Sequence, residues 1–269
     1  MGLRDPVSSA SHLLVAAWAI YAFLVLIRCT QAYHRSSIAI FGISMILLYT
    51  ASGVFHGVPF TKAGNPATFR FFQRIDRSAI FVLIAGSNTP LIVTLLGRAW
   101  RRWFLWGIWT LALAGAACIW ILSKPPHEAI IVICMGLGLL GFLPAAHYYR
   151  AVGWRAMNWA LAGCVLYALG AVCELVEWPL LSDYPVRVGY HEVFHLFNAA
   201  ASVVFFLFVA RYIVPIKLIP AAAEHESRST LPGENSPTPA VCLFAISVIS
   251  TNAKRELKTT AFKSEPSSS

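Results

Sequence analysis

Charged residues are scarce in this sequence. Asp, Glu, Lys and Arg make up 12% of its residues, whereas about a quarter of the residues of a soluble domain are charged. Hydrophobic residues make up 58%, so the chain has too few polar side chains to cover a surface in water. A soluble globular domain is therefore excluded as the main part of this protein.

Closely spaced cysteine pairs are absent as well. The six cysteines form no C-x-x-C pair, which argues against a disulfide framework and against a zinc site built from thiolates. Basic and aromatic residues are not interleaved, so the net charge of +9 does not indicate a nucleic-acid surface. The arginines flank apolar segments instead, where the headgroups of anionic membrane lipids are the expected partners.

Apolar segments dominate the chain, and their lengths are near the roughly 20 residues that a helix needs to cross a bilayer. We expect an all-α membrane protein: a seven-transmembrane helix bundle in residues 1–217, followed by a polar, disordered tail in residues 218–269. The predicted spans are residues 12–27, 38–57, 78–97, 103–122, 128–147, 157–176 and 192–214.

Ionisable residues gather near one depth of this predicted bundle. His56 closes the second span, Asp76 opens the third, and His191 and His195 open the seventh. Ser52 lies one helical turn before His56. Because successive spans cross in alternating directions, all of these positions lie on the membrane face of the N-terminus. Ionisable groups inside spans are costly, so their concurrence indicates function.

The histidines have the spacing of a metal site. His191 and His195 are four residues apart, so they share one helical face and can bind one ion, with His56 as a third ligand. Three neutral imidazoles leave the fourth tetrahedral position of Zn²⁺ open for a water whose pKa falls to about 7, as in catalytic zinc sites. We interpret Asp76 as the general base and Ser52 as the group that holds the water or polarises a substrate carbonyl.

Other polar residues have plainer interpretations. Asn198 and Ser202 continue the polar face of the seventh span, either as a strip leading inward from the metal or as ordinary interhelical hydrogen-bonding groups. Glu174, at the end of the sixth span, is interpreted as part of a solvated helix end. The histidines interpreted as interfacial side chains are His12, His34, His127 and His147.

Residues 191–195 also match H-E-x-x-H, the zinc protease signature. In that interpretation Glu192 is the general base, and the protein is an intramembrane metalloprotease. The short pattern also occurs by chance, and a glutamate in the first turn of a helix is favoured by the helix dipole alone. Both interpretations stay open at this stage.

Four segments of the sequence are similar to the hemolysin III family. They are residues 5–12 (DPVSSASH), 48–56 (LYTASGVFH), 74–90 (RIDRSAIFVLIAGSNTP) and 189–197 (GYHEVFHLF). The resemblance implies seven helices and a zinc ion held by His56, His191 and His195, with Asp76 and Ser52 close to the metal. One departure is Arg77, which stands where the family has a histidine and can pair with Asp76, lowering its basicity.

The hemolysin III family is related to the progestin and adiponectin receptors and, more remotely, to alkaline ceramidases. The resemblance therefore implies an integral multi-pass protein of the cell membrane, with its N-terminus and metal site on the cytoplasmic side. It also implies a zinc-dependent hydrolase of a lipid amide or ester. The alternative is a non-catalytic receptor, or a cytolytic channel-like protein, in which zinc is structural. The sequence indicates no particular protein partner.

Overall fold

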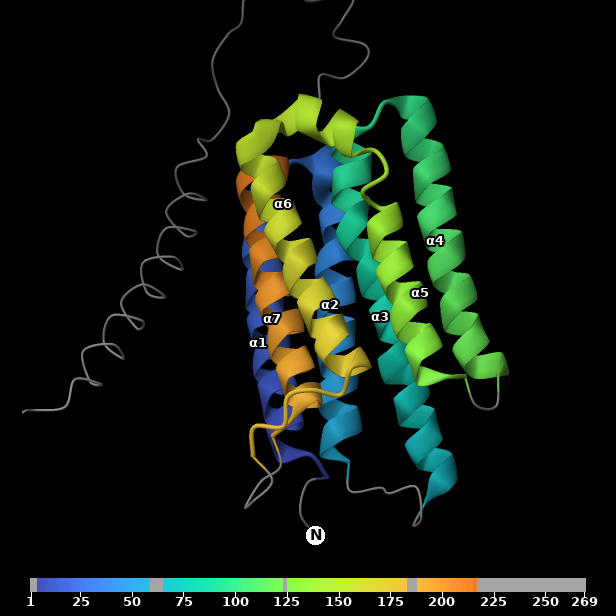
Figure 1. The fold of residues 1–269 in the computed structure, drawn as a ribbon. Coiled ribbons are helices and arrows are strands. Elements are labelled where there is room, and N and C mark those ends of the chain that lie inside the picture. Colours follow the sequence, from blue (N-terminus) through green and yellow to red (C-terminus); the bar gives the residue numbers. More distant parts are fainter. Residues whose placement is uncertain (1–3, 59–64, 123–124, 183–187, 217–269) are drawn as a thin grey trace, which may run out of the picture. The chain divides into compact units, whose positions relative to one another are not determined.

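The computed structural model describes residues 4–58, 65–122, 125–182 and 188–216, and the regular secondary structure in these ranges is helical apart from one isolated β-bridge (Figure 1). The predicted all-α class is confirmed. The chain divides into Met1–Ile216 and Lys217–Ser269. The second part, with the predicted tail, lies outside the described residues. The elements are α1 (Pro6–Cys29), η1 (Ala32–His34), α2 (Arg35–Gly57), α3 (Pro66–Leu95), α4 (Arg98–Ile121), α5 (His127–Leu140), α6 (Ala145–Leu175), α7 (Tyr190–Phe208) and η2 (Val209–Ile213).

Six of these helices are long and apolar enough to cross a membrane, and α5 is shorter. With 14 residues, α5 is about 21 Å long at 1.5 Å per residue, whereas the hydrocarbon core is about 30 Å thick. The helix ends because Gly141 and Pro144 are poor helix residues and the chain turns between them before α6 begins. The described residues thus give an integral membrane helical bundle, and the predicted count of seven spans is not established by helix length.

Helix α3 begins earlier than the predicted third span, at Pro66 and not at residue 78. Asn65 caps it by accepting a hydrogen bond from the backbone N–H of Thr68, 3.2 Å away, and proline is well suited to a first helical turn. Asp76 consequently does not open the helix. It lies ten residues after Pro66, about 15 Å along the axis.

The helices differ in how deeply they are packed. Helix α3 is the central one, because 67% of the residues in its apolar stretch are buried. Helix α4 lies at the periphery, with 17% of the corresponding residues buried. Helix α1 packs on α2 and also contacts α7, and α6 packs on α7 (Figure 1). Helix α7 thus lies beside α1, which is distant from it in sequence, and beside α6, which precedes it.

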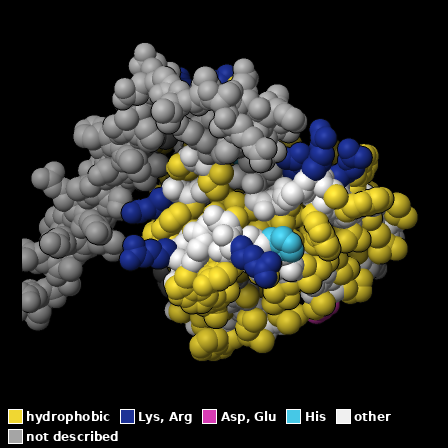
Figure 2. Space-filling view, turned by 90° about the horizontal axis from the view of Figure 1, so that it is seen from above, with side chains coloured by type: hydrophobic (Ala, Val, Ile, Leu, Met, Phe, Trp, Pro, Cys, Tyr) yellow, Lys and Arg dark blue, Asp and Glu magenta, His cyan; other side chains and the backbone are white. Residues whose placement is uncertain are grey.

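The two ends of the bundle carry different charges. All six acidic residues in the described ranges lie toward the end where α1 begins, which we call the site end: Asp5, Asp76, Glu128, Glu174, Glu177 and Glu192. The other end, which we call the arginine end, carries Arg28, Arg35, Arg98, Arg101, Arg102, Arg150, Arg155 and Arg211. Figure 2 views this end and shows basic side chains above apolar flanks.

Candidate metal centre

The structure brings the three predicted histidine ligands together. His56 lies in the last turn of α2, and His191 and His195 lie in the first two turns of α7. The Nε2 atom of His191 is 3.3 Å from Nε2 of His56 and 2.9 Å from Nε2 of His195. One ligand atom from each ring lies within 4.8 Å of the others. Three ring nitrogens therefore converge on one point.

These separations fit a tetrahedral ion. Nitrogen atoms that each lie 2.0–2.1 Å from a zinc ion in tetrahedral geometry are about 3.3–3.4 Å apart. The distance between His56 and His191 has this value, and the distance between His191 and His195 is slightly shorter. The third pair, His56 and His195, has its ligand atoms no more than 4.8 Å apart, so two of the three separations are near those of a zinc ligand set.

The partners of the other ring nitrogens determine which nitrogens can bind a metal. His56 Nδ1 lies 3.0 Å from the carboxylate of Asp5, and His191 Nδ1 lies 3.1 Å from both oxygens of Glu174. A carboxylate only accepts, so Nδ1 of His191 donates to Glu174. Nδ1 of His56 also lies 3.3 Å from the Nη2 donor of Arg4, but its shorter contact with Asp5 assigns it the proton. Each neutral ring then has an unprotonated Nε2. Two nitrogen lone pairs thus face each other across 3.3 Å, an arrangement that a cation between them stabilises.

Asp5 holds His56 at two points. Its backbone N–H donates to the carbonyl oxygen of His56 at 3.0 Å, and its side chain accepts from the ring. The hydrogen bond with His56 lowers the pKa of Asp5 to about 2. Arg4 pairs with the same carboxylate at 2.9 Å. Asp5 lies in the segment 5–12 that resembles the hemolysin III family, but the sequence did not predict this role for it.

Glu174 is a supporting group that the sequence interpretation missed. It is 5% exposed and contacts His191 and the Nε2 atom of His127, the latter at 2.9 Å. The interpretation of Glu174 as part of a solvated helix end is wrong, because α6 ends against α7 and buries its carboxylate. An acidic residue near the end of an apolar helix was the available signal.

The two predicted catalytic residues lie beside the histidines. Ser52 is buried one turn before His56, and its hydroxyl interacts with the Asp76 carboxylate from α3. Asp76 is also an electrostatic neighbour of His56 and His191. Arg77, expected to pair with Asp76, directs its guanidinium toward His127 instead, with Nη2 3.4 Å from Nδ1. Its positive charge still acts on Asp76 from the adjacent position.

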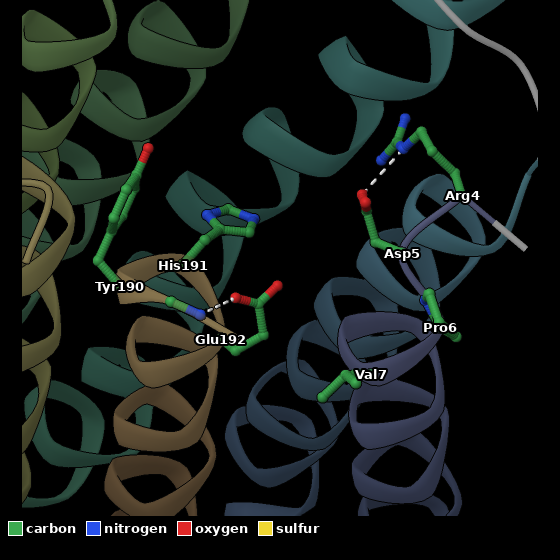
Figure 3. Close-up of a pocket in the computed structure, with 8 residues that line it drawn as sticks. Arg4, Asp5, Pro6, Val7, Tyr190, His191 and Glu192 are labelled. Atoms are coloured by element: carbon green, nitrogen blue, oxygen red, sulfur yellow. Dashed lines mark hydrogen bonds and ion pairs between the residues drawn. The ribbon is translucent and has the colours of Figure 1, made fainter. Parts of the chain in front are cut away.

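Glu192, the base of the alternative protease interpretation, is engaged in capping α7. One carboxylate oxygen accepts from the backbone N–H of Gly189 at 2.7 Å, and the other accepts from the Ser8 hydroxyl at 3.0 Å. Figure 3 shows Glu192 with His191 on one side of a pocket of about 240 Å³, and Arg4 with Asp5 on the other. Both oxygens of Glu192 thus have structural partners.

A larger cavity of about 610 Å³ adjoins the histidines inside the bundle. His56, His191, His195, Asp76 and Ser52 lie in its wall, whereas most of its remaining lining is apolar. The apolar side chains come mainly from α2, α3, α5 and α6, and include Leu48, Leu83, Ile130, Leu139 and Leu161, with Phe142 from the turn between α5 and α6. The predicted site residues thus form a polar part of a cavity that is otherwise mostly apolar.

The polar face of α7 divides into two parts. Asn198 lines the cavity, whereas Ser202 is buried between Tyr49 and Tyr167, whose hydroxyls lie 2.6 and 2.8 Å from its Oγ. Tyr49 in turn donates to the carbonyl oxygen of Asn198 at 2.9 Å. Of the two interpretations of this strip, interhelical hydrogen bonding therefore describes Ser202.

Comparisons with known proteins show the family of this chain. Residues 3–206 match the family model described as "Haemolysin-III related". The chain is similar to "Hemolysin-3" of Bacillus cereus, with 29% identity over 79% of this chain and 94% of that protein. It is also similar to the "Hemolysin-3 homolog" of Bacillus subtilis (strain 168), at 26% identity over 70% of this chain and 83% of that protein.

A human protein is similar over a comparable stretch. The "Monocyte to macrophage differentiation factor" of Homo sapiens is 26% identical over 76% of this chain and 82% of its own length. The family match covers all five predicted site residues, and it extends over most of the helical part of the chain. This protein therefore belongs to the haemolysin-III related family.

Proposed function

We propose that this protein is a zinc-dependent membrane hydrolase that cleaves an amide or ester bond of a lipid. The observation that carries the proposal is the convergence of three histidine Nε2 atoms beside Asp76 and Ser52, in the wall of a largely apolar cavity. Polar groups at one place in an apolar chamber are what a lipid substrate requires, since its scissile bond is polar and its chain is not.

The size and lining of the cavity support a substrate with a long apolar chain. Its volume of about 610 Å³ lies within the range of roughly 300–1,000 Å³ that is typical of small-molecule sites. Apolar side chains of α3, α5 and α6 line it away from the histidines. A chain that enters sideways between helices fills this part and brings its amide or ester carbonyl to the polar part.

Each polar residue has a separate role in this proposal. His56, His191 and His195 would hold a zinc ion, which would supply a Lewis acid and lower the pKa of a bound water. Asp76 accepts a proton at its carboxylate, and the Ser52 hydroxyl donates a hydrogen bond toward the substrate carbonyl. Asp5 and Glu174 keep the rings of His56 and His191 in the tautomer that exposes Nε2.

The same observations weigh differently on the two alternatives. A protease that uses Glu192 as its base is disfavoured, because both carboxylate oxygens of Glu192 cap α7 or bind Ser8. A non-catalytic receptor or cytolytic protein with structural zinc is the second candidate. It is favoured by the origin of the ligands, since His56 of α2 and His191 and His195 of α7 let one ion join two helices.

We propose further that α5 completes a seventh crossing and that the site end faces the cytoplasm of a cell membrane. Helix α4 ends and α5 begins at the site end, and α6 begins at the arginine end, so the chain has to return between them. The turn at residues 141–144 extends the reach of α5 in that direction. Labelling of single cysteines introduced at Glu177 and at Arg102, in intact cells, tests this orientation.

Turnover by purified protein tests the hydrolase. Zinc-loaded protein in detergent or nanodiscs is expected to hydrolyse ceramide or a fatty acyl ester, and Asp76→Asn is expected to lose at least a hundredfold in rate while keeping zinc. Glu177→Gln, which removes an exposed acid at the same end, is the matched control. Stoichiometric zinc without turnover on either substrate class, or unchanged turnover in Asp76→Asn, contradicts the proposed catalysis.

A further inference from the structure

His12 lies in the interior of the bundle and not at the membrane interface. It is 3% exposed, and neither of its ring nitrogens has a hydrogen-bond partner in the described part of the chain. Its interpretation as an interfacial side chain is wrong, because α1 packs closely on α2. At the point of contact the Ser9 hydroxyl donates to the carbonyl oxygen of Gly53 at 2.9 Å. A buried histidine with two unpaired nitrogens calls for a partner.

The nearest candidate for that partner is His195. The ring centroids of His12 and His195 are 3.9 Å apart, and the rings are perpendicular. His195 is farther from its two fellow ligands, with centroid distances of 4.4 Å to His191 and 4.9 Å to His56. By the distance between ring centroids, His12 therefore lies closer to His195 than either other predicted ligand does.

His195 also lacks the support that the other two ligands have. The Nδ1 atoms of His56 and His191 each contact a carboxylate, but Nδ1 of His195 is buried and has no partner among the described residues. A histidine that binds a metal through Nε2 carries its proton on Nδ1, and this N–H group is normally hydrogen-bonded. The two rings in contact, His12 and His195, thus both carry ring nitrogens without a partner among the described residues.

We propose that His12 is the positioning residue for His195, accepting the Nδ1–H of His195 on an unprotonated ring nitrogen and so directing Nε2 to the metal. The bond requires a rotation of one of the two rings, whose centroids are 3.9 Å apart. The inference rests on the metal centre of the proposed function and does not require hydrolysis. It completes a set in which every ligand has an outer partner: Asp5 for His56, Glu174 for His191 and His12 for His195.

The chemistry of the position favours a neutral partner. Asp5, Asp76 and Glu174 already place carboxylates around the three ligands. A further carboxylate beside His195, which is 4% exposed, would bury one more charge in an apolar surrounding. A neutral imidazole supplies the acceptor without a charge. His12 also lies seven residues after Asp5, the N-cap of α1, so the first part of α1 and its cap support two of the three ligands.

The affinity of the purified full-length protein for Zn²⁺, measured by competition with a chelator, tests the inference. His12→Phe keeps an aromatic ring but no acceptor, and is expected to bind Zn²⁺ about 10–100-fold more weakly than the wild type. His12→Gln keeps an acceptor oxygen and is expected to recover part of the loss. His147→Phe, which alters an exposed histidine at the arginine end, is expected to leave the affinity unchanged.

Two further measurements separate positioning from packing. The visible absorption of the Co²⁺-substituted protein reports coordination geometry and is expected to change in His12→Phe, whereas thermal unfolding of the metal-free protein reports packing alone. If His12→Phe does not fold, the same comparison between His12→Gln and His12→Leu decides, with weaker Zn²⁺ binding expected in the leucine variant. Equal affinity in wild type and the acceptor-free variant overturns the inference.

The outcomes also distinguish this inference from the proposed hydrolase. A wild-type protein that binds Zn²⁺ tightly without turnover removes the hydrolase and leaves the role of His12 standing. Unchanged Zn²⁺ affinity in His12→Phe removes the role of His12 and leaves the hydrolase standing. A wild-type protein that does not bind Zn²⁺ overturns both.

Discussion

The two ends of the bundle satisfy their polar residues in different ways. At the site end, carboxylates and histidines from α2, α5, α6, α7 and the residue before α1 contact one another. The arginine end has no acidic residue in the described ranges, and exposed tryptophans such as Trp103 begin α4 beside its arginines. The polar groups at the site end thus contact one another, whereas the exposed arginines and tryptophans at the arginine end suit contact with headgroups and water.

One buried histidine at each end, His34 and His56, shows how the partners of a histidine differ between the two ends. His34, at the arginine end, is 1% exposed; its Nε2 lies 3.1 Å from the carbonyl oxygen of Ile216, and its Nδ1 lies 3.4 Å from the Thr94 hydroxyl. Both nitrogens have neutral partners, and no other histidine shares them. His56, equally buried, has a carboxylate on one nitrogen and two further histidines at the other. Burial alone therefore does not distinguish a structural histidine from a ligand, whereas its partners do.

Alanine substitution of a histidine at each end is expected to give the largest difference. His191→Ala removes the ligand that lies between the other two, so the zinc content is expected to fall from about one ion per chain to none. His34→Ala is expected to keep its zinc and to lose about 1–3 kcal/mol of stability, because two buried hydrogen bonds are lost. Metal analysis and thermal unfolding measure the two effects. Loss of zinc in His34→Ala would break the comparison.

Removal of the buried support of a ligand is expected to have the next largest effect. Glu174→Ala leaves Nδ1 of His191 without its acceptor, so zinc affinity is expected to fall about 10–100-fold. Glu174→Gln retains an acceptor oxygen and is expected to lose less. Glu177→Ala, three residues later on an exposed position, is the control. Equal losses in Glu174→Ala and Glu177→Ala would mean that general charge, and not the contact with His191, governs affinity.

The parts of this site that could be predicted from sequence are those that depend on helical periodicity or on the alternating direction of the spans. Four-residue spacing places His191 and His195 on one helical face, and the alternating direction of spans brings His56 to the same membrane side. The supporting residues Asp5, Glu174 and His12 follow no such rule, because their partners lie on other helices. Their roles depend on how closely α1 and α6 pack, which a hydropathy pattern does not encode.

The boundaries of the fold show the same limit. Hydropathy placed the start of the third span at residue 78, because Arg70, Gln73 and Arg74 are polar, whereas the helix continues back to Pro66. Hydropathy reports where a segment is apolar, and hydrogen bonding and capping determine where a helix begins. For α5 the pattern overestimated length, since Gly141 ends the helix inside a continuous apolar run.

Removal of Asp5, the exposed carboxylate that supports His56, is expected to reduce zinc affinity less than removal of the buried Glu174. Asp5 has a side chain that is 42% exposed, compared with 5% for Glu174. Water can therefore replace the carboxylate at His56 Nδ1, and Asp5→Ala is expected to weaken zinc binding by less than about tenfold. Asp5→Asn, with an acceptor oxygen retained, is the paired control. A larger loss in Asp5→Ala than in Glu174→Ala would reverse the order that burial predicts.

The smallest effect is expected from the arginine end and concerns lipid instead of metal. Arg102 is exposed near the start of α4, so its guanidinium can contact an anionic headgroup. Each such arginine contributes about 1 kcal/mol, so Arg102→Gln is expected to reduce retention of phosphatidylglycerol over phosphatidylcholine by up to about fivefold. Native mass spectrometry of protein extracted from mixed bilayers measures this ratio. Arg70→Gln alters an exposed arginine at the site end, where acidic residues offset its charge, and is expected to change the ratio less. Equal changes in both variants would show that the two ends do not differ toward lipid, whatever their difference toward metal.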